Sequence, residues 1–396
     1  MVTDLDEWRL ILQKDTSPAY GLSVDESTSI AVSEGRTPPV LHLYNFLPCA
    51  IVGRYQDIEE ALNIPECERF GIAYDRRHTG GGTVLMGPKQ LAIGFSIPTQ
   101  YPGIGDSINR IFSRLGGVLC NALAKLRLRA RYRPKNDLEI GGKKIAGLSA
   151  SLELRNTAFF HASILLDFDF KLMLNVFKLP LKKIEDKHIS CFTERMTTLK
   201  KELHRSIDMP TLQSLVRSAF EEEFGVKFRI DTLTQWESDT VETLLTTRYT
   251  NPEWIFSRKH PKTAQAIVSR KTRGGLIEIA VTFSGGVIEA AYITGDFLST
   301  TRGINNIESA LKYCAADRKA LKQRLAPVLN ENTIYRVEPQ TIIDMIVEAK
   351  EKSLKAAPIT EVKKEEKARK ARPIKKKRAK KVKKIAPKRR PAKRRK

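Results

Sequence analysis

The segment "NDLEIGGKKIAGLSASLELRNTAFFHASILLDFDF" (residues 136–170) contains three apolar runs separated by two short turns, the first built on a glycine pair. This pattern predicts three consecutive strands in an antiparallel meander. Segments on either side of it, at 108–128 and 209–225, have apolar residues at helical spacing, and the second ends at Gly225. Strands flanked by helices in this way indicate an α+β fold with a mixed or antiparallel sheet.

The remaining regular elements follow from the same signals. We expect a helix in 21–35, two strands around a turn at Pro48 in 39–56, a helix interrupted at Pro65 in 58–71, and strands in 72–77 and 90–98. A second unit begins near residue 260, where "GGLIEIAVTFSGGVIEAAYITGDF" (274–297) predicts a β-hairpin that is followed by a short helix.

The length of 396 residues exceeds that of one typical domain. We expect a main domain over 1–250, a small α+β accessory domain over 251–348 and a disordered tail over 349–396. Residues 350–396 contain 24 Lys and Arg against four Asp and Glu, so the tail carries +20 of the formal net charge of +24. With almost no aromatic or β-branched residues, the tail is predicted to be disordered, and its charge favours weak, sequence-independent contact with nucleic acid.

The cysteines and the N-terminus indicate the compartment. Five widely spaced cysteines form no C-x-x-C motif and no H-E-x-x-H occurs, so neither a disulfide framework nor a zinc site is expected. The N-terminus has early acidic residues and does not resemble a secretory signal. No apolar run approaches the roughly 20 residues that a membrane-spanning helix needs. We expect a cytoplasmic protein with no membrane partner.

Three short motifs carry the functional signal: "RRHTGGG" (76–82), "NDLEIGGKKIAG" (136–147) and "FFHASILL" (159–166). Taken singly, each has an ordinary explanation as a tight turn, a solvated lysine or a core histidine. Three consecutive glycines are costly to order, however, and they indicate backbone that passes close to another group. The two preceding arginines suggest that this group is negatively charged.

In this order and spacing, the motifs resemble those of the lipoate–protein ligase family. The family pattern is an R-R-x-[ST]-G-G-G loop, an N-D pair followed by G-x-K-[IV]-x-G, and a strand with hydrophobic-H-x-[ST]-hydrophobic. The resemblance includes "GRYQDIEEALN" (53–63), spans roughly residues 15–345 and leaves the basic tail outside. It implies a biotin/lipoate ligase-like fold for the main domain and an accessory domain that acts as a lid or carrier-docking module.

Enzymes of this family activate a carboxylate with ATP as an acyl-adenylate and pass the acyl group to a lysine of a carrier protein. The resemblance makes Lys144 the catalytic residue, because a cation between the acyl carbonyl and the α-phosphate stabilises the charge that develops on both. Asn136 and Asp137 would bind the incoming amine, or Asp137 would hold Mg²⁺, so ATP and Mg²⁺ are the implied cofactors. The expected set of ATP- and adenylate-binding residues is Arg77, Gly80, Gly81, Gly82, Thr83, Val84, Leu85, Asn136, Asp137, Lys144 and Gly147.

Within this set, the glycine N–H groups would approach the phosphates, and the Arg77 guanidinium would offer them a planar fork. The implied lipoate pocket is formed by His161, Ser163 and Ile164, and the apolar side chains of this region line the tunnel or else pack in the core.

The chain departs from the family pattern at one point. The family usually has an aromatic-His-Asp step and then Gly-Asn after the glycines, whereas this chain has "LMGPKQ" (85–90), which leaves Gln90 as the candidate for the missing amide.

The implied substrate is lipoate or octanoate, and the implied carriers are the lipoyl domains of 2-oxoacid dehydrogenase complexes and the glycine cleavage H protein. Octanoyl and lipoyl transferases of the same fold remain an alternative. They use a cysteine near the position of Asn136 and no ATP, and this chain has no cysteine between Cys120 and Cys191. Biotin–protein ligase is disfavoured because its Gly-Arg-Gly loop is absent. A nucleic-acid-associated protein that acts through the tail is the alternative of another class.

Overall fold

The computed structural model describes residues 7–134, 136–154, 156–178 and 194–356. The residues up to Ser353 form one compact unit. Within the described ranges, no helix has the length and apolar character that crossing a membrane requires. The tail from residue 357, and with it the expected contact with nucleic acid, lies outside the described residues, as does Cys191.

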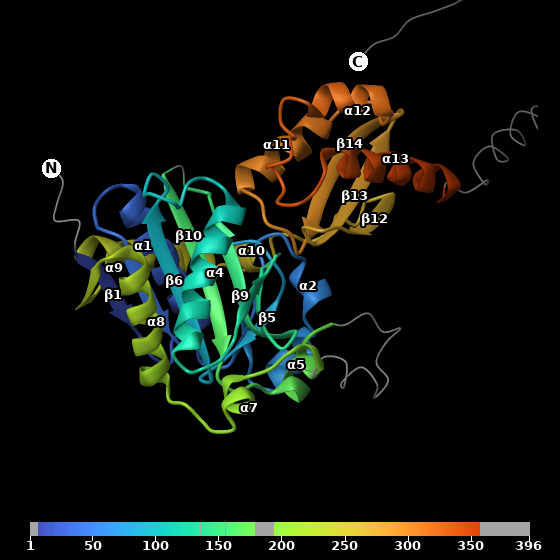
Figure 1. Cartoon of the computed structure of the whole chain (residues 1–396). Coiled ribbons are helices and arrows are strands. Elements are labelled where there is room, and N and C mark those ends of the chain that lie inside the picture. The colour runs from blue at the N-terminus through green and yellow to red at the C-terminus, as the bar shows by residue number, and fades with distance from the viewer. Residues whose placement is uncertain (1–6, 135, 155, 179–193, 357–396) are drawn as a thin grey trace, which may run out of the picture. The chain divides into compact units, whose positions relative to one another are not determined.

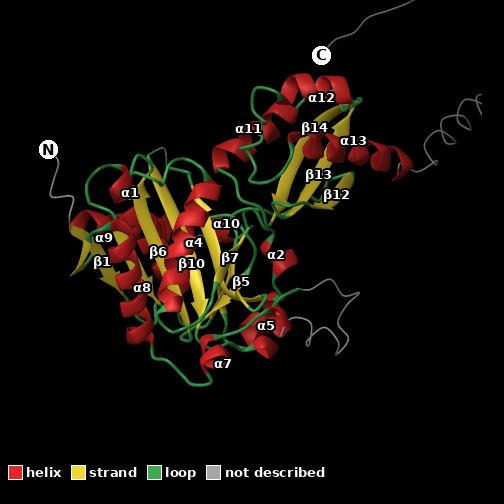
Figure 2. Ribbon diagram, viewed as in Figure 1, coloured by secondary structure: helices red, strands yellow, loops and turns green. Residues whose placement is uncertain are grey.

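An eight-stranded sheet is the main element of the fold (Figure 1 and Figure 2). In spatial order its strands are β11 (Lys227–Asp231), β1 (Glu7–Leu12), β2 (Val40–Tyr44), β6 (Gln90–Pro98), β10 (Thr157–Leu165), β9 (Lys143–Ser151), β8 (Asp137–Ile140) and β7 (Arg131–Arg133). Strand β1 is parallel to both β11 and β2, whereas the other neighbours are antiparallel. The predicted α+β fold with a mixed sheet is confirmed, and β8, β9 and β10 form the expected meander.

One face of this sheet is covered by α4 (Ile108–Ala124) and α8 (Met209–Phe224), which lie in front of it in Figure 1. Between the helices and the sheet, Phe112 and Phe160 are fully buried in the largest core cluster. Burying a side chain of this size contributes about 1.5–3 kcal/mol. Helix α8 ends at Gly225, whose φ of 66° is the left-handed conformation that favours glycine after a helix.

The opposite face packs against α1 (Pro18–Ser33), which in turn contacts α9 (Gln235–Leu244) and the π-helix η2 (Leu245–Tyr249). Helix α1 approaches β6 closely because Gly94 has no side chain: a Cβ there would lie 2.2 Å from Asp25 Oδ1. This approach buries the Asp25 carboxylate against the sheet.

A second, three-stranded sheet carries the triple-glycine segment. Its order is β4 (Ala73–Arg76), β3 (Cys49–Val52) and β5 (Val84–Met86), and the glycines lie in the loop between β4 and β5. The short helices of this part of the chain are α2 (Ile58–Ala61), α3 (Ile64–Arg69), α5 (Phe170–Val176), α7 (Leu199–Leu203) and α10 (Pro252–Ile255). The break between α2 and α3 falls beside Pro65, where the sequence predicts it.

The C-terminal elements form a third sheet with helices. They are β12 (Ala266–Lys271), β13 (Leu276–Ser284), β14 (Val287–Gly295), α11 (Thr301–Leu311), α12 (Arg318–Leu325) and α13 (Pro339–Ala356). The predicted hairpin is β13–β14, and its turn residues Gly285 and Gly286 have φ of 56° and 87°. Helix α13 continues past the domain end expected at residue 348, because its buried face extends to Ala349. The division at residue 250 stays a prediction.

Candidate active site

Two adjoining cavities lie between the meander and the triple-glycine loop. The outer cavity has a volume of about 590 Å³ and the inner cavity of about 100 Å³. Both are lined by Gly82, Thr83, Val84, Lys144, Gly147 and Ser163. The wall of the inner cavity includes the apolar side chains of Phe46, Ile51 and Met86 beside polar ones. The shared residues therefore mark a junction between a large cavity and a small one.

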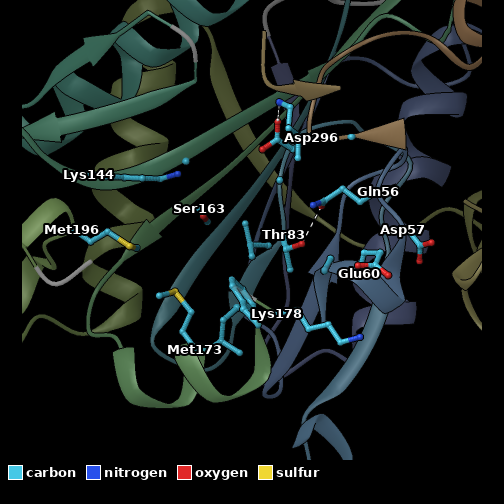
Figure 3. A pocket seen from close by; sticks show the side chains of 18 of the residues that line it. Gln56, Asp57, Glu60, Thr83, Lys144, Ser163, Met173, Lys178, Met196 and Asp296 are labelled. Carbon is cyan, nitrogen blue, oxygen red and sulfur yellow. Dashed lines mark hydrogen bonds between the residues drawn. The ribbon is translucent and has the colours of Figure 1, made fainter. Parts of the chain in front are cut away.

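Lys144 reaches this junction because of a β-bulge in β9. In the β8–β9 pair, Leu138 lies opposite Ala146. The next residue of β8, Glu139, lies opposite Lys144, so Ile145 is an extra residue in β9. A bulge redirects the side chains of the strand that contains it. Ile145 and Ala146 are both in the core, and the Lys144 side chain extends toward the cavity (Figure 3).

Asp137 holds the Lys144 ammonium in place. Lys144 Nζ lies 2.7 Å from Asp137 Oδ1, and Arg133 Nη2 lies 2.6 Å from Oδ2. Burial opposes ionisation of Asp137, but the two cations outweigh it, so the pKa of this carboxyl lies below its ordinary value. Gly147 leaves room for the lysine, since a Cβ at this position would lie 3.2 Å from Lys144 Nζ.

Asp137 does not fit the expected role of a Mg²⁺ ligand. Both of its carboxylate oxygens are in ion pairs with cationic side chains. Within the described ranges, no group of three or more His, Cys, Asp or Glu could hold a metal ion. Because Mg²⁺ is bound through carboxylate oxygens together with phosphates and water, a carboxylate that is already neutralised is a poor ligand. Asp137 instead positions Lys144.

The triple-glycine loop packs against the segment that follows β14. Gly81 N–H donates to Phe297 O over 3.0 Å, and a Cβ at Gly80 would lie 2.4 Å from the same oxygen. Gly81 also has a φ of +96°, and its carbonyl oxygen would lie 1.9 Å from a Cβ at Gly53. Gly80 and Gly81 thus approach other parts of the chain closely, whereas the sequence suggests phosphate contact for all three glycines.

Arg77 also faces the protein. Its Nη2 donates to Gly80 O over 2.7 Å and to Gly82 O over 2.8 Å, and its Nε donates to Thr79 Oγ1 over 3.1 Å. Burial lowers the pKa of the guanidinium to about 10. The fork expected to bind a phosphate or carboxylate is therefore used to fix the glycine loop, and Arg77 contributes only to the wall of the inner cavity.

Gly82 and Thr83 remain open to the junction. A Cβ at Gly82 would meet no atom nearer than Asp296 Cβ, at 3.9 Å. Thr83 Oγ1 donates to Gln56 Oε1 over 3.0 Å, which also accepts from Gly53 N–H over 2.9 Å (Figure 3). Of the three glycines, Gly82 is the one whose backbone a ligand can approach, because free space lies where a side chain would project.

His161 lies at the inner cavity above a buried polar network. Asp25 accepts a hydrogen bond from the Tyr44 hydroxyl over 2.7 Å and lies 2.8 Å from His42 Nδ1. His161 Nε2 lies 3.3 Å from the Tyr44 oxygen. Since the Tyr44 hydroxyl donates to Asp25, this geometry requires His161 Nε2–H as a donor and leaves Nδ1 as an acceptor. Burial lowers the pKa of His161 to about 4 despite the attraction of Asp25, so the ring is neutral near pH 7.

Ser163 and Ile164 lie on opposite sides of β10, because successive side chains of a strand alternate between faces. Ser163 lines both cavities. Ile164 is fully buried in the core beneath α4 and α8 and lines neither cavity. The expected pocket role of Ile164 is therefore wrong, and core packing is correct. Leu85 lines the outer cavity and Val84 lines both.

Two amide side chains take different positions. Asn136 lines the inner cavity, and its Nδ2 donates to Leu148 O over 3.0 Å. Gln90 instead donates through Nε2 to Asp167 O over 2.9 Å and lines neither cavity. Gln90 thus ties the start of β6 to the end of β10 and does not supply the missing amide of the site.

Sequence reasoning missed the network of Asp25, His42 and Tyr44. A signal was present: β2, "VLHLY", is buried at every position, and His42 and Tyr44 alternate on one face of this apolar run. Buried polar side chains need hydrogen-bond partners. The sequence could not name Asp25 as that partner, because it lies on a different element.

None of the four described cysteines lines the outer or the inner cavity. These residues are Cys49, Cys67, Cys120 and Cys314. Burial raises the pKa of each thiol. A thiol with a raised pKa is largely protonated near neutral pH and is a poor nucleophile. The described walls of the site therefore offer a lysine but no thiolate.

Comparisons with known proteins show the family of the chain. The family described as "Lipoyl protein ligase A/B catalytic domain" matches residues 17–221, and the family described as "Bacterial lipoate protein ligase C-terminus" matches residues 264–346. Octanoyltransferase LipM of Brevibacillus brevis is 26% identical over 278 residues, which cover 64% of this chain and 100% of the relative.

Two solved structures have the same fold. The bi-partite lipoate protein ligase of Thermoplasma acidophilum, from a study of that archaeal lipoylation system with its E2 lipoyl domain, has a TM-score of 0.59 at 25% identity and covers 65% of this chain and 99% of its own. LipL1 of P. falciparum, in complex with lipoate, has a TM-score of 0.67 at 16% identity and covers 86% and 98%. The chain therefore belongs to the family of the lipoyl protein ligase A/B catalytic domain, and it also carries the C-terminal domain of bacterial lipoate protein ligases.

Proposed function

We propose that this chain is an ATP-dependent lipoate–protein ligase. It activates lipoate or octanoate as the acyl-adenylate and transfers the acyl group to a lysine of lipoyl domains of 2-oxoacid dehydrogenase complexes and of the glycine cleavage H protein. The observation that carries the proposal is the position of Lys144, whose side chain lies at the junction of the two cavities and is held by Asp137 over 2.7 Å.

The two cavities differ in size. The inner cavity is the narrower one, and the apolar side chains of Phe46, Ile51 and Met86 in its wall suit an acyl chain. The outer cavity, of about 590 Å³, falls in the range of about 300–1,000 Å³ that is usual for ligand sites. The open backbone of Gly82 lies at its edge, where N–H groups can meet phosphate oxygens. The reacting carboxylate and the α-phosphate would then meet at the junction.

Lys144 is suited to both half-reactions. Its ammonium stabilises negative charge on the reacting carboxylate and phosphoryl oxygens, and such a preorganised donor is worth about 10²–10³-fold in rate. Asp137 keeps the ammonium fixed, so it does not have to reorient during the reaction. Asn136 donates through Nδ2 to Leu148 O, which leaves its Oδ1 as an acceptor for the incoming amine.

The C-terminal domain would act as a lid on the glycine loop. Gly81 N–H is bonded to Phe297 O, and Tyr55 Oη donates to Ser299 O over 3.0 Å. Closed over bound ATP, the domain would exclude water and protect the acyl-adenylate from hydrolysis. Deletion of residues 260–346 should impair activation more than transfer from pre-formed lipoyl-adenylate. Equal loss of both steps would contradict the lid.

A cysteine-dependent transferase remains the competing function, because the B. brevis relative is an octanoyltransferase. Its match covers that whole relative but only 64% of this chain, and the C-terminal family matched at 264–346 is one of ligases. Cys191 is the one cysteine that lies outside the described residues. The Cys191→Ser variant therefore separates the two functions.

The decisive experiment measures ATP–pyrophosphate exchange and acylation of a recombinant lipoyl domain by mass spectrometry. We expect exchange that requires lipoate or octanoate, persists in Cys191→Ser and is lost in Lys144→Ala. ATP-independent transfer from an octanoylated carrier that is abolished in Cys191→Ser would overturn the ligase and establish the transferase.

A further inference from the structure

A third cavity, here the rear cavity, lies beyond the inner one. It has a volume of about 340 Å³ and is lined by Ser151, Thr157 and Phe159 of the sheet and by His78 of the glycine loop. Neither the outer nor the inner cavity includes any of these residues. The rear cavity is thus a separate space with its own walls.

The inner and rear cavities are consecutive along the same face of β10. Ser163 and His161 line the inner cavity, and Phe159 and Thr157, the next positions on that face, line the rear cavity. Strand β9 repeats this order, because Ser149, opposite His161, lines the inner cavity and the following Ser151 lines the rear one. Each step of two residues along a strand is about 7 Å.

Phe159 is the first residue on this face beyond the inner cavity, whose lining on β10 ends at His161. Its side chain is 3% exposed, and its ring centroid lies 5.8 Å from that of His161, on the side of the inner cavity. Its ring centroid lies 5.0 Å from that of His78, which stands across the gap on the glycine loop. The two rings therefore lie next to each other in the wall of the rear cavity, just beyond His161.

The rear cavity contains charged side chains in its wall. Arg248 forms an ion pair with Glu26, and Arg54 stacks on Trp254 with its guanidinium carbon 4.2 Å from the ring centroid. An acyl tail that passed Phe159 would have to displace water from these charged groups, which is costly. The charged groups of the rear cavity thus favour acyl chains that end before Phe159.

We infer that Phe159, braced by His78, is the end wall that sets the length of the acyl chain this enzyme accepts. The inference rests on the proposed function, because it needs an acyl carboxylate at Lys144 and a tail that runs along β10. From Ser163 to Phe159 the strand rises about 13 Å, so the site takes medium-chain acyl groups. Truncating Phe159 to alanine would lengthen the inner cavity by the volume of the phenyl ring.

The test compares octanoate, decanoate and dodecanoate in ATP–pyrophosphate exchange by the full-length chain. In Phe159→Ala we expect the ratio of kcat/KM for dodecanoate to that for octanoate to rise at least about tenfold, since one methylene in a hydrophobic pocket is worth about 10–200-fold. The matched control is Leu154→Ala, which enlarges the rear cavity at another wall and should keep the wild-type profile. If Phe159→Ala does not fold, Phe159→Leu gives a smaller shift in the same direction.

Each other outcome counts against the inference. A Phe159→Ala or Phe159→Leu enzyme that activates octanoate with the wild-type chain-length profile overturns the end wall and leaves the proposed function standing. An equal shift in Leu154→Ala also overturns it, because Phe159 would then not be what limits length. A wild-type chain that activates no acid, lipoate included, overturns the proposed function and the end wall together.

Discussion

The glycine loop and the lysine hairpin, on either side of the candidate site, both contain glycines, yet they differ in nearly every physical respect. At the glycine-loop wall (residues 76–82), a Cβ at Gly80 would lie 2.4 Å from a backbone oxygen, and burial lowers the pKa of Arg77 to about 10. At the lysine-hairpin wall (residues 136–147), Gly142 is in open space and Lys144 is partly exposed to the cavity. The first wall is packed against other parts of the chain, and the second presents an accessible charge to the cavity.

The largest effect that tests this contrast is expected from Lys144→Ala. Removing one preorganised electrostatic donor typically costs about 10²–10³-fold in rate, and we expect that loss in lipoate-dependent pyrophosphate exchange. Folding should be little affected, because the side chain is 32% exposed. Lys143→Ala is the matched control, since Lys143 is the exposed neighbour on the same strand. Near-normal exchange by Lys144→Ala would show that the hairpin wall is not where the chemistry occurs.

A second effect concerns His161, a buried residue of the inner cavity, and the dependence of stability on pH. Burial lowers the pKa of His161 to about 4 from an ordinary value of 6.5, so the unfolded chain binds a proton at pH 5 that the folded chain does not. The contribution of His161 to stability should therefore fall as the pH drops from about 6.5 to about 4 and then level off. At 1.36 kcal/mol for each pKa unit, the loss is about 3 kcal/mol.

Urea unfolding of wild type and His161→Gln between pH 4 and pH 7 measures the contribution of His161 to the free energy of unfolding. Relative to the variant, wild type should lose about 3 kcal/mol between pH 7 and pH 4, while His204→Gln, at an exposed histidine, should follow wild type. Parallel curves for wild type and His161→Gln would mean that His161 is protonated in the folded protein and that the assigned hydrogen-bond pattern is incorrect.

The sequence predicts those parts of the fold whose pattern lies within one segment of the chain. The meander, α4, α8 and the β13–β14 hairpin follow from periodicity and turn residues within single segments. The pairing of β1 with β11 does not, because Glu7–Leu12 meets Lys227–Asp231 from the other end of the domain. Fold class and motif positions were therefore accessible, whereas sheet order was not.

The site shows the same limit. The sequence identifies Lys144 and the three glycines, but not the extra residue Ile145 that turns Lys144 toward the cavity. It also cannot tell that the Arg77 guanidinium faces the loop carbonyls, because that depends on the backbone conformation of Gly80 to Gly82. The motifs identify the candidate residues, and the backbone conformation determines which of their side chains face the cavity.

Two glycines of the same loop should respond differently to substitution by alanine. In Gly80→Ala the new methyl group would press on Phe297 O, and we expect a loss of about 1–3 kcal/mol in the free energy of unfolding, as is usual for overpacking. In Gly82→Ala, where the nearest atom is 3.9 Å away, stability should be unchanged and nucleotide affinity reduced. Urea denaturation and calorimetric titration with a non-hydrolysable nucleotide measure the two quantities. Equal stability of the two variants would refute the packing asymmetry.

The smallest effect is expected at the turn of the lysine hairpin. Gly142 has a φ of +78°, and a Cβ at this position would have no atom within 4 Å, so Gly142→Ala should cost only the backbone strain of about 1–2 kcal/mol. Gly142→Asn should cost less, because asparagine tolerates left-handed backbone better than other residues with a side chain. Pyrophosphate exchange should stay near the wild-type rate in both variants, since the buried Ile145 anchors the bulge that directs Lys144. If exchange instead fell as far as in Lys144→Ala, the turn rather than the bulge would be positioning the lysine, and the hairpin wall would depend on its glycines as much as the opposite wall does.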